Sequence, residues 1–426
     1  MGARDNTDAR SLVTDARSIA TRWRDEMDLR DMTGKLLEDS GVKDLTLDVV
    51  AIGKASLEMT AAVVDALGES VHRGLAVCDD TAPRRSASIT DVVVGDHPVP
   101  GEGSLRAGMA VFDFLSQPSD ADVTLFLISG GASSLCVAPA PPVTLDDLAA
   151  VWRAALRSGV DITALNMIRA ASSLIAGGAV LRRVSTARSQ SFILVDNVVS
   201  GAEWVASAMT YEFRPSESFV AELWHRIGIA DRDLRGRLLA GFETRSAIMA
   251  NVPDTRHENA VLADPAMMLE SAINQAERLG YEVLNMGADI SGDVENVVAQ
   301  WSSVIDSAPT RPVALVGAGE VTVKVRGDGE GGRCQEFAWL MASVLDRAER
   351  DGVFVAQSSD GRDHVEGVGG AWVDRATSTI ARDHGIDWAA VAASHDTYPA
   401  LKSIGRLIEG EHTGWNLCDL YVAVLA

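Results

Sequence analysis

Residues 123–134 read VTLFLISGGASS, a largely apolar run that passes directly into serine, glycine and alanine. A short apolar run without alternation is typical of a strand buried on both faces of a parallel sheet. The small residues of the following segment, 129–134, predict a tight turn at which a phosphate can approach the backbone closely. This stretch therefore predicts an α/β protein.

The segments on either side repeat the alternation of strand and helix. Residues 45–52 and 191–195 are further apolar runs. Helices are predicted over residues 8–38, 144–158 and 163–183, the second of them opened by the capping candidate Thr144. Strands alternating with helices are typical of a parallel sheet covered by helices.

The second half of the chain changes in character. Strands are predicted at residues 312–316, 321–325, 353–356 and 420–424, with a helix that starts at Gln335. Between them and the first half lies an irregular segment that contains several prolines. We therefore place a domain boundary loosely between residues 210 and 310.

Charge and composition exclude several classes of protein. The 426 residues contain 38 Lys and Arg against 60 Asp and Glu, a net charge of -22, and no basic patch stands out. Such a field repels phosphate backbones, so we expect no nucleic-acid partner. No apolar run reaches membrane-spanning length, and the N-terminus lacks a signal-peptide core. Four scattered cysteines without a CxxC pair predict buried thiols in a reducing cytoplasm.

Two loops in the first half follow predicted strands, where ligands bind in open α/β sheets. The loop at residues 53–56 contains Lys54, one of only five lysines in the chain. It is not a P-loop, because Asp48 stands where the first glycine of that motif falls. The loop at residues 129–134 lacks a hydrolase elbow. A solvated lysine and an ordinary tight turn are the alternatives for these two loops.

Two further loops lie in the second half. Residues 327–333, GDGEGGR, satisfy GxGxxG formally, but the two acidic residues inside the loop oppose a pyrophosphate. A loop that presents Arg333 to a phosphate or carboxylate is the favoured interpretation. Residues 359–363, SDGRD, supply two aspartates that could coordinate Mg²⁺ or act as a base, unless they form a solvated turn. Together the four loops predict an anion-handling cleft.

These loops are part of a series of motifs that runs in a consistent order from residue 45 to 424. The motifs are IGKA at 52–55, GDHPVP at 95–100, SGGAS at 129–133, SGVDI at 158–162 with Asn166 and Arg169, AGE at 318–320, GGRCQE at 331–336, DGRD at 360–363 and TGWN at 413–416. In this combination the chain resembles the glycerate 2-kinase family, class II glycerate kinases that carry a MOFRL domain and are also called hydroxypyruvate reductases. The resemblance implies a Rossmann-like N-terminal domain, residues 1–240, and a smaller C-terminal α/β domain, residues 310–426.

The resemblance also implies an activity, transfer of the ATP γ-phosphate to the 2-hydroxyl group of D-glycerate with Mg²⁺. Lys54 and Arg333 would neutralise the phosphoryl group, and Asp196 would bind the metal or take the hydroxyl proton. Asp360 would be a second metal ligand. The residues expected to bind nucleotide or substrate are Ser129, Gly130, Gly131, Ala132, Ser133, Arg169, Glu320, Gln335, Asp360 and Asn416.

Several family positions are altered, and they leave the reaction open. RAASS at 169–173 stands where the family has Arg-Lys-His-Leu-Ser, so a lysine and a histidine are gone. Met209, Glu411 and Trp415 take up room and add repulsion toward a polyphosphate. One alternative is a member that has lost ATP chemistry and converts, or only binds, a small anionic metabolite. Another is an NAD(P)H-dependent 2-oxoacid reductase. The acceptor and the oligomeric state, a homodimer included, also stay open.

Overall fold

The computed structural model describes residues 5–79, 90–197, 201–251 and 255–426. The chain divides into two compact units, one formed by residues 29–263 and the other by residues 1–28 together with 264–426. The domain limits expected from the sequence, 1–240 and 310–426, stay a prediction. We use the two units as the frame for the fold and the site.

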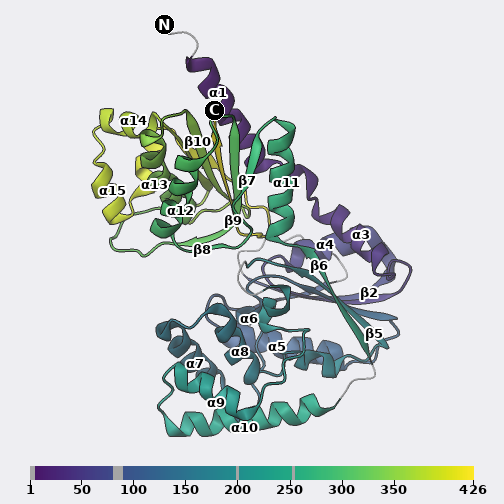
Figure 1. The fold of residues 1–426 in the computed structure, drawn as a ribbon. Helices are drawn as coiled ribbons and strands as arrows, with labels where there is room; N and C mark the ends of the chain where they lie inside the picture. Colours follow the sequence, from purple (N-terminus) through teal and green to yellow (C-terminus); the bar gives the residue numbers. More distant parts are fainter. Residues whose placement is uncertain (1–4, 80–89, 198–200, 252–254) are drawn as a thin grey trace. The chain divides into compact units, whose positions relative to one another are not determined.

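The unit of residues 29–263 is built on a six-stranded sheet in which every neighbouring pair is parallel (Figure 1). The strands are β1 (Leu47–Ile52), β2 (Val71–Cys78), β3 (Thr90–Val94), β4 (Val123–Ile128), β5 (Arg188–Leu194) and β6 (Arg256–Ala263). Their order, β3-β2-β1-β4-β5-β6, is that of a Rossmann sheet and reverses direction between β1 and β4. The predicted α/β class is confirmed, and β1 and β4 are buried throughout, as their apolar runs indicated.

Helices cover both faces of this sheet, α3 and α4 on one side and α5 and α6 on the other (Figure 1). The helices of the unit are α3 (Leu29–Asp39), α4 (Ser56–Leu67), α5 (Glu102–Ser116), α6 (Ala132–Leu135), α7 (Leu145–Ser158), α8 (Ile162–Ala171), α9 (Glu217–Arg226) and α10 (Arg232–Ala250). Helices α7 to α10 enclose a hydrophobic cluster of their own. The predicted cap of α7 is confirmed, because the Thr144 hydroxyl accepts from the Asp147 N–H and the Asp147 carboxylate accepts from the Thr144 N–H.

The other unit contains a mixed sheet in the order β12-β11-β10-β13-β9-β7, with β8 paired to β9. Its strands are β7 (Glu282–Asn285), β8 (Ile290–Asp293), β9 (Val313–Thr322), β10 (Gly352–Ser358), β11 (Val368–Asp374), β12 (Leu407–Glu409) and β13 (Asp419–Leu425). Strand β13 runs antiparallel to both of its neighbours, β10 and β9. Edge-to-face contacts of Trp301 with Phe337, Phe354 and Tyr421 fill the core on one face.

Helices also cover both faces of the mixed sheet, with α12 and α13 opposite α1 and α11 (Figure 1). The helices of this unit are α1 (Asp5–Thr21), α2 (Trp23–Glu26), α11 (Pro265–Arg278), α12 (Val294–Ser307), α13 (Arg333–Arg347), α14 (Thr377–Asp383), α15 (Trp388–Ser394) and α16 (Thr397–Ser403). Helix α1 contacts β10 and β13, and the Tyr281 hydroxyl donates to Asp15 at 2.8 Å. The N-terminal helix therefore covers part of one face of the sheet that is formed by the C-terminal segment.

Three predicted elements differ from the structure. The single helix expected over 8–38 is broken, because Met27 leaves the helical region (φ -114°, ψ 68°) where the chain passes between units. The helix expected over 163–183 ends at Ala171. The strand expected at 312–316 continues as one strand, β9, to Thr322, so residues 323–325 of the strand expected at 321–325 lie outside it. Its Gly319 does not break the strand but admits β8, since a Cβ there would lie 2.0 Å from the Ile290 carbonyl oxygen.

Candidate active site

Lys54 lies where the order of the parallel sheet reverses, at the carboxyl end of β1. Gly53 turns the chain with a φ of 131°, and a Cβ there would lie 2.2 Å from the Ser129 hydroxyl oxygen. The Lys54 N–H donates to the Gly130 carbonyl at 2.9 Å, and the Ala55 N–H donates to the Ser129 hydroxyl at 3.1 Å. The loops after β1 and β4 are thus bonded together, while the Lys54 side chain is exposed.

Two glycines form the wall between Lys54 and Asp196. A Cβ at Gly130 would lie 1.5 Å from Asp196 Oδ2, so this position has no room for a side chain. A Cβ at Gly131 would lie 3.2 Å from Lys54 Cγ and 3.3 Å from His97 Cδ2, and its φ of 81° also favours glycine. The structure therefore brings the predicted lysine, glycine loop and aspartate together.

Burial and the nearby charge of Lys54 together determine the pKa values of Asp196 and His97. Burial raises the pKa of the Asp196 carboxyl, and the positive charge of Lys54 opposes that rise. Burial also lowers the pKa of His97, and Lys54 lowers it further. At neutral pH His97 is therefore a neutral ring, and Asp196 has a greater affinity for a proton than a solvated aspartate.

A cavity of about 360 Å³ opens beside Gly130, Gly131 and Asp196 and is also lined by Arg169. Arg169 comes from the last turn of α8; its Nη1 donates to Asn166 at 3.3 Å, and its guanidinium lies 4.3 Å from the centre of the Trp152 ring. Burial lowers the pKa of Arg169 to about 9, so the group stays charged at neutral pH. Within the described part of the chain no carboxylate pairs with it, and the cavity is therefore cationic.

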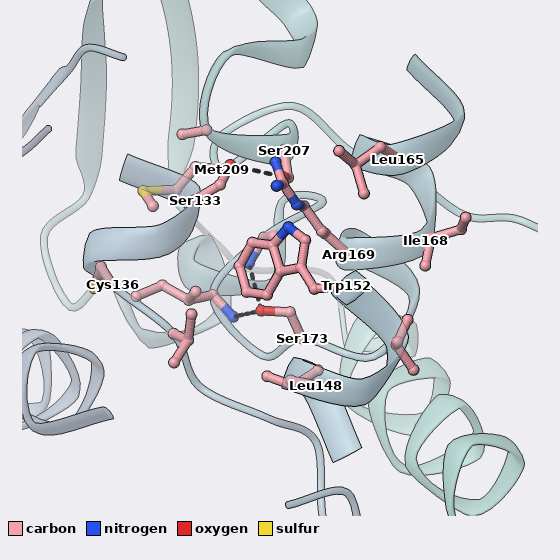
Figure 2. A pocket seen from close by; sticks show the side chains of 15 residues that line it. Ser133, Cys136, Leu148, Trp152, Leu165, Ile168, Arg169, Ser173, Ser207 and Met209 are labelled. Atoms are coloured by element: carbon pink, nitrogen blue, oxygen red, sulfur yellow. Dashed lines mark hydrogen bonds between the residues drawn. The ribbon is translucent and has the colours of Figure 1, made fainter. Parts of the chain in front are cut away.

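A chain of hydrogen bonds positions Asn166 under this cation. Ser133 and Ser207 share a hydrogen bond of 2.7 Å, the Ser207 hydroxyl donates to Asn166 Oδ1 at 3.1 Å, and Asn166 Nδ2 donates to the Trp204 carbonyl at 3.2 Å (Figure 2 shows the serine pair). The sequence analysis named Ser133 and Asn166 but not Ser207. Ser207 lies near Met209, in a segment that differs from the family pattern, and that difference could have drawn attention to it.

One predicted residue of the other unit, Arg333, is bonded to Asp419, a fully buried carboxylate. Arg333 Nε and Nη2 donate to Asp419 at 2.5 and 2.9 Å, and Nη1 pairs with Glu320 at 2.6 Å. Burial disfavours the Arg333 charge, but the two carboxylates outweigh it and raise the pKa of the group. The guanidinium fork that we expected to clamp a ligand is therefore engaged within the protein. A ligand contact of Arg333 stays a prediction.

The other three predicted residues of this unit are bonded within it. Gln335 is fully buried, and its N–H and Nε2 donate to the Asp363 carboxylate at 2.9 and 3.0 Å. Asp360 Oδ1 accepts from the backbone N–H two residues later at 2.8 Å. Asn416 Oδ1 accepts from the Ser359 hydroxyl at 3.0 Å. Gln335 thus orients Asp363 rather than lining an open surface.

The glycine run at residues 327–332 packs against the segment between α15 and α16. A Cβ at Gly329 would lie 2.4 Å from the Ser394 carbonyl oxygen, and one at Gly331 would lie 2.1 Å from Thr397 Oγ1. The run follows β9, whose sheet does not have the Rossmann order. These glycines are explained by close packing, so the dinucleotide interpretation of the GxGxxG pattern gains no support.

Arg333→Lys is expected to lower the free energy of unfolding by about 1–3 kcal/mol, because a single ammonium cannot satisfy both oxygens of buried Asp419. We expect kcat to fall more than about tenfold as the loop moves. Urea unfolding and steady-state kinetics measure the two effects. Arg362→Lys, at an exposed position of the same unit, is the control. If Arg333→Lys kept wild-type stability and activity, the paired hydrogen bonds from Arg333 to Asp419 would not have the importance given to them here.

Asp363 makes stability depend on pH. Burial, with negative Asp419 nearby, raises the pKa of Asp363 to about 6, above the roughly 3.9 of a solvated aspartate. Between about pH 4 and 6 the folded protein keeps a proton that the unfolded chain has lost. The free energy of unfolding should therefore fall with rising pH in this window, by up to about 3 kcal/mol, and level off above it. Urea titrations test this, and an equally steep slope in Asp363→Asn would contradict it.

Comparison with known proteins places the chain in a family. Residues 13–237 match the family model described as "Domain of unknown function (DUF4147)", and residues 313–419 match the MOFRL family. The chain is 28% identical to a glycerate 2-kinase of Pyrococcus horikoshii, over 88% of this chain and 87% of the relative. It is 32% identical to a putative hydroxypyruvate reductase of Agrobacterium vitis, over 87% of this chain and 85% of the relative.

A solved structure shows the same fold. The crystal structure of a glycerate kinase from Thermotoga maritima superposes with a TM-score of 0.86 and 24% identity, covering 98% of this chain and 100% of that one. The two family regions, the motif order and the shared fold agree with one another. The chain therefore belongs to the glycerate 2-kinase family that combines DUF4147 and MOFRL regions.

Proposed function

We propose that the protein transfers the γ-phosphoryl group of ATP to the 2-hydroxyl group of D-glycerate or a closely similar hydroxy acid. The observation that carries the proposal is the glycine-walled cavity at the sheet reversal, which Asp196 and Arg169 line, with Lys54 next to its Gly131 wall. Phosphoryl transfer needs mainly positioning and charge neutralisation, which these groups supply. Family relatives named glycerate 2-kinase support the same activity.

Each group then has one task. Arg169 binds the carboxylate of the acid, and Lys54 neutralises the oxygens of the transferred phosphoryl group. The loop at 129–133 lets that group approach the backbone. As the bond from the γ-phosphorus to the ADP oxygen breaks, a bond to the 2-hydroxyl oxygen forms. The hydroxyl proton passes to Asp196, whose raised pKa gives it a greater affinity for a proton than a solvated aspartate has.

The donor set fits an Mg²⁺ ion that arrives with the nucleotide. In residues 5–79, 90–197, 201–251 and 255–426 no three His, Cys, Asp or Glu side chains cluster into a metal site. Mg²⁺ commonly binds through one or two carboxylates, with phosphates and waters completing its shell. Asp360 is the proposed protein ligand, and Asp196 is the alternative ligand if another group takes the hydroxyl proton. When bound, the ion would offset negative charge on the phosphates.

The proposal is tested with purified protein, ATP, Mg²⁺ and D-glycerate. We expect ADP to form, and phosphorus NMR to show a phosphate ester at the 2-position. A parallel assay with NADH and hydroxypyruvate measures the reductase alternative. NADH oxidation without ADP formation would replace the kinase proposal. Binding of the acid, by calorimetry, with neither turnover would instead support a member that has lost ATP chemistry.

We also propose that the protein works in the cytoplasm on a small anionic metabolite. All four cysteines are buried and none is bonded to another described cysteine, as is usual in a reducing compartment. Among the described helices, none has both the length and the hydrophobicity needed to cross a membrane. The net charge of -22 disfavours a nucleic-acid partner. Analytical ultracentrifugation of the purified protein would show whether it forms a homodimer.

A further inference from the structure

A second cavity, of about 30 Å³, adjoins the cationic one. The two share Ser133, Trp152, Arg169 and Ala206 as lining residues. Figure 2 shows the smaller cavity, with the Arg169 guanidinium and the Trp152 ring among the side chains that line it. A ligand bound to Arg169 from the larger cavity therefore has the smaller one directly beside it.

The wall of the smaller cavity is apolar. Its aliphatic and sulfur-containing lining residues are Cys136, Val137, Leu148, Val151, Leu165, Ile168, Ile175, Ala176, Ala206 and Met209. The serines beside them are already bonded: the Ser173 hydroxyl accepts from two backbone N–H groups at 3.2 Å each, and Ser133 bonds to Ser207 (Figure 2). Trp152 Nε1 is buried without a hydrogen-bond partner, so its N–H is one donor beside this space. The rest of the wall offers a polar group of a ligand little to bond with and favours an apolar one.

Arg169 supplies the anchor for such a ligand. Its Nε is buried without a hydrogen-bond partner, and no carboxylate of the described residues neutralises its charge. A cation removed from water without a partner is costly, and a carboxylate with its two oxygens matches a guanidinium fork. The two cavities together thus present a carboxylate-binding cation beside a small apolar space.

The size of that space limits what can enter it. One water needs about 10–15 Å³ of such volume, so about 30 Å³ holds two or three non-hydrogen atoms and no aromatic ring. D-Glycerate would bring only a hydroxymethyl group, whose hydroxyl would find at most the Trp152 N–H and otherwise aliphatic carbon. A short aliphatic branch of similar size fits the space and its chemistry.

We infer that the acceptor of this protein is a 2-hydroxy acid with a short aliphatic branch at C3, its carboxylate on Arg169 and its branch in the smaller cavity. This inference rests on the proposed function and narrows its substrate class. The 2-hydroxyl group stays in the larger cavity, which Asp196 also lines.

Calorimetry without nucleotide tests the inference on the full chain. We expect 2-hydroxy-3-methylbutanoate to bind at least about tenfold more tightly than D-glycerate, because it buries two more apolar groups. Arg169→Gln should weaken the binding of both acids. Equal affinities, or tighter binding of glycerate, would overturn the inference.

Variants at Val151, which lines only the smaller cavity, sharpen the test. Val151→Ile fills the space, so the ratio of the two dissociation constants should fall toward one. Val151→Ala enlarges it, so the longer 2-hydroxy-4-methylpentanoate should become the preferred acid. The matched control is Val220→Ala, which removes the same atoms from the same hydrophobic cluster but lines neither cavity. A ratio that changes as much in the control as at Val151 would overturn the inference.

The outcomes separate the inference from the proposed function. If D-glycerate is phosphorylated and the branched acid binds no better, the inference fails and the kinase stands. If the branched acid binds tightly, with the expected Val151 effects, but no ADP forms with it or with glycerate, the ligand class stands and the kinase fails. Phosphorylation of the branched acid at lower KM than glycerate would support both.

Discussion

Lys54→Ala is expected to lower kcat at least about 10²–10³-fold while leaving thermal stability nearly unchanged. The loss follows from removing the cation that acts on both Asp196 and His97 beside the glycine wall. Stability is spared because the side chain is exposed and packs little, so we expect a change within about 0.5 kcal/mol. Paired turnover and melting measurements on the purified variant check both halves of the prediction.

The control for this variant is Lys35→Ala. Lys35 is exposed on α3, in the same unit, and lines neither cavity. It should therefore keep wild-type turnover. A Lys54→Ala protein as active as Lys35→Ala would remove the phosphoryl-transfer mechanism proposed above.

Gly130→Ala is expected to reduce kcat by about 10²–10⁴-fold, the amount that a positioned proton acceptor contributes. The added methyl group would lie 1.5 Å from Asp196 Oδ2, so either the loop or the carboxylate must move. Overpacking of this kind also costs about 1–3 kcal/mol of stability. Steady-state kinetics and urea unfolding measure the two losses.

A second glycine provides the matched comparison. Gly236 lies within α10, and a Cβ there would meet no atom within 4 Å. Gly236→Ala should therefore stabilise the protein slightly, by about 0.5–1 kcal/mol, and keep its activity. If Gly130→Ala proved as harmless as Gly236→Ala, Asp196 could not hold the position that the mechanism needs.

The glycine wall shows what the sequence could predict. Lys54, Gly130 and Asp196 lie far apart along the chain, but each follows the end of a buried apolar run. Parallel strands deliver such ends to one edge of a sheet, so β1, β4 and β5 bring the three loops together. Apolar runs and the small residues after them predicted the loops at 53–56 and 129–134, whereas Asp196 entered only through the resemblance to the family.

The engaged state of Arg333 could not be predicted in the same way. A guanidinium after a glycine run has the same sequence signature whether it faces a ligand or a carboxylate of its own protein. Its partner Asp419 opens β13, and only the pairing of β13 with β9 places it there. The smaller cavity is hidden for a related reason, because its wall combines apolar side chains from separate helices that look like ordinary core.

The packing partner of the N-terminal helix could not be predicted from the sequence either. An amphipathic pattern predicts that one face of a helix is buried but does not name the surface that buries it. Helix α1 covers the sheet of residues 264–426, although the parallel sheet follows it directly in the chain. The helical stretch is interrupted at Met27, where the chain passes from one unit to the other. The sequence around Met27 contains no proline or glycine from which this break could have been predicted.

The central place of β13 has a consequence for how the chain folds during synthesis. The mixed sheet cannot form its β10-β13-β9 core until residue 425 has left the ribosome. Helix α1, made among the first residues, would wait roughly 20–80 s for its partner at about 5–20 residues per second. Throughout that delay its apolar face is exposed, although the parallel sheet of the other unit has already been made. Chaperone dependence in the cell should therefore originate in this unit, and in its earliest helix above all.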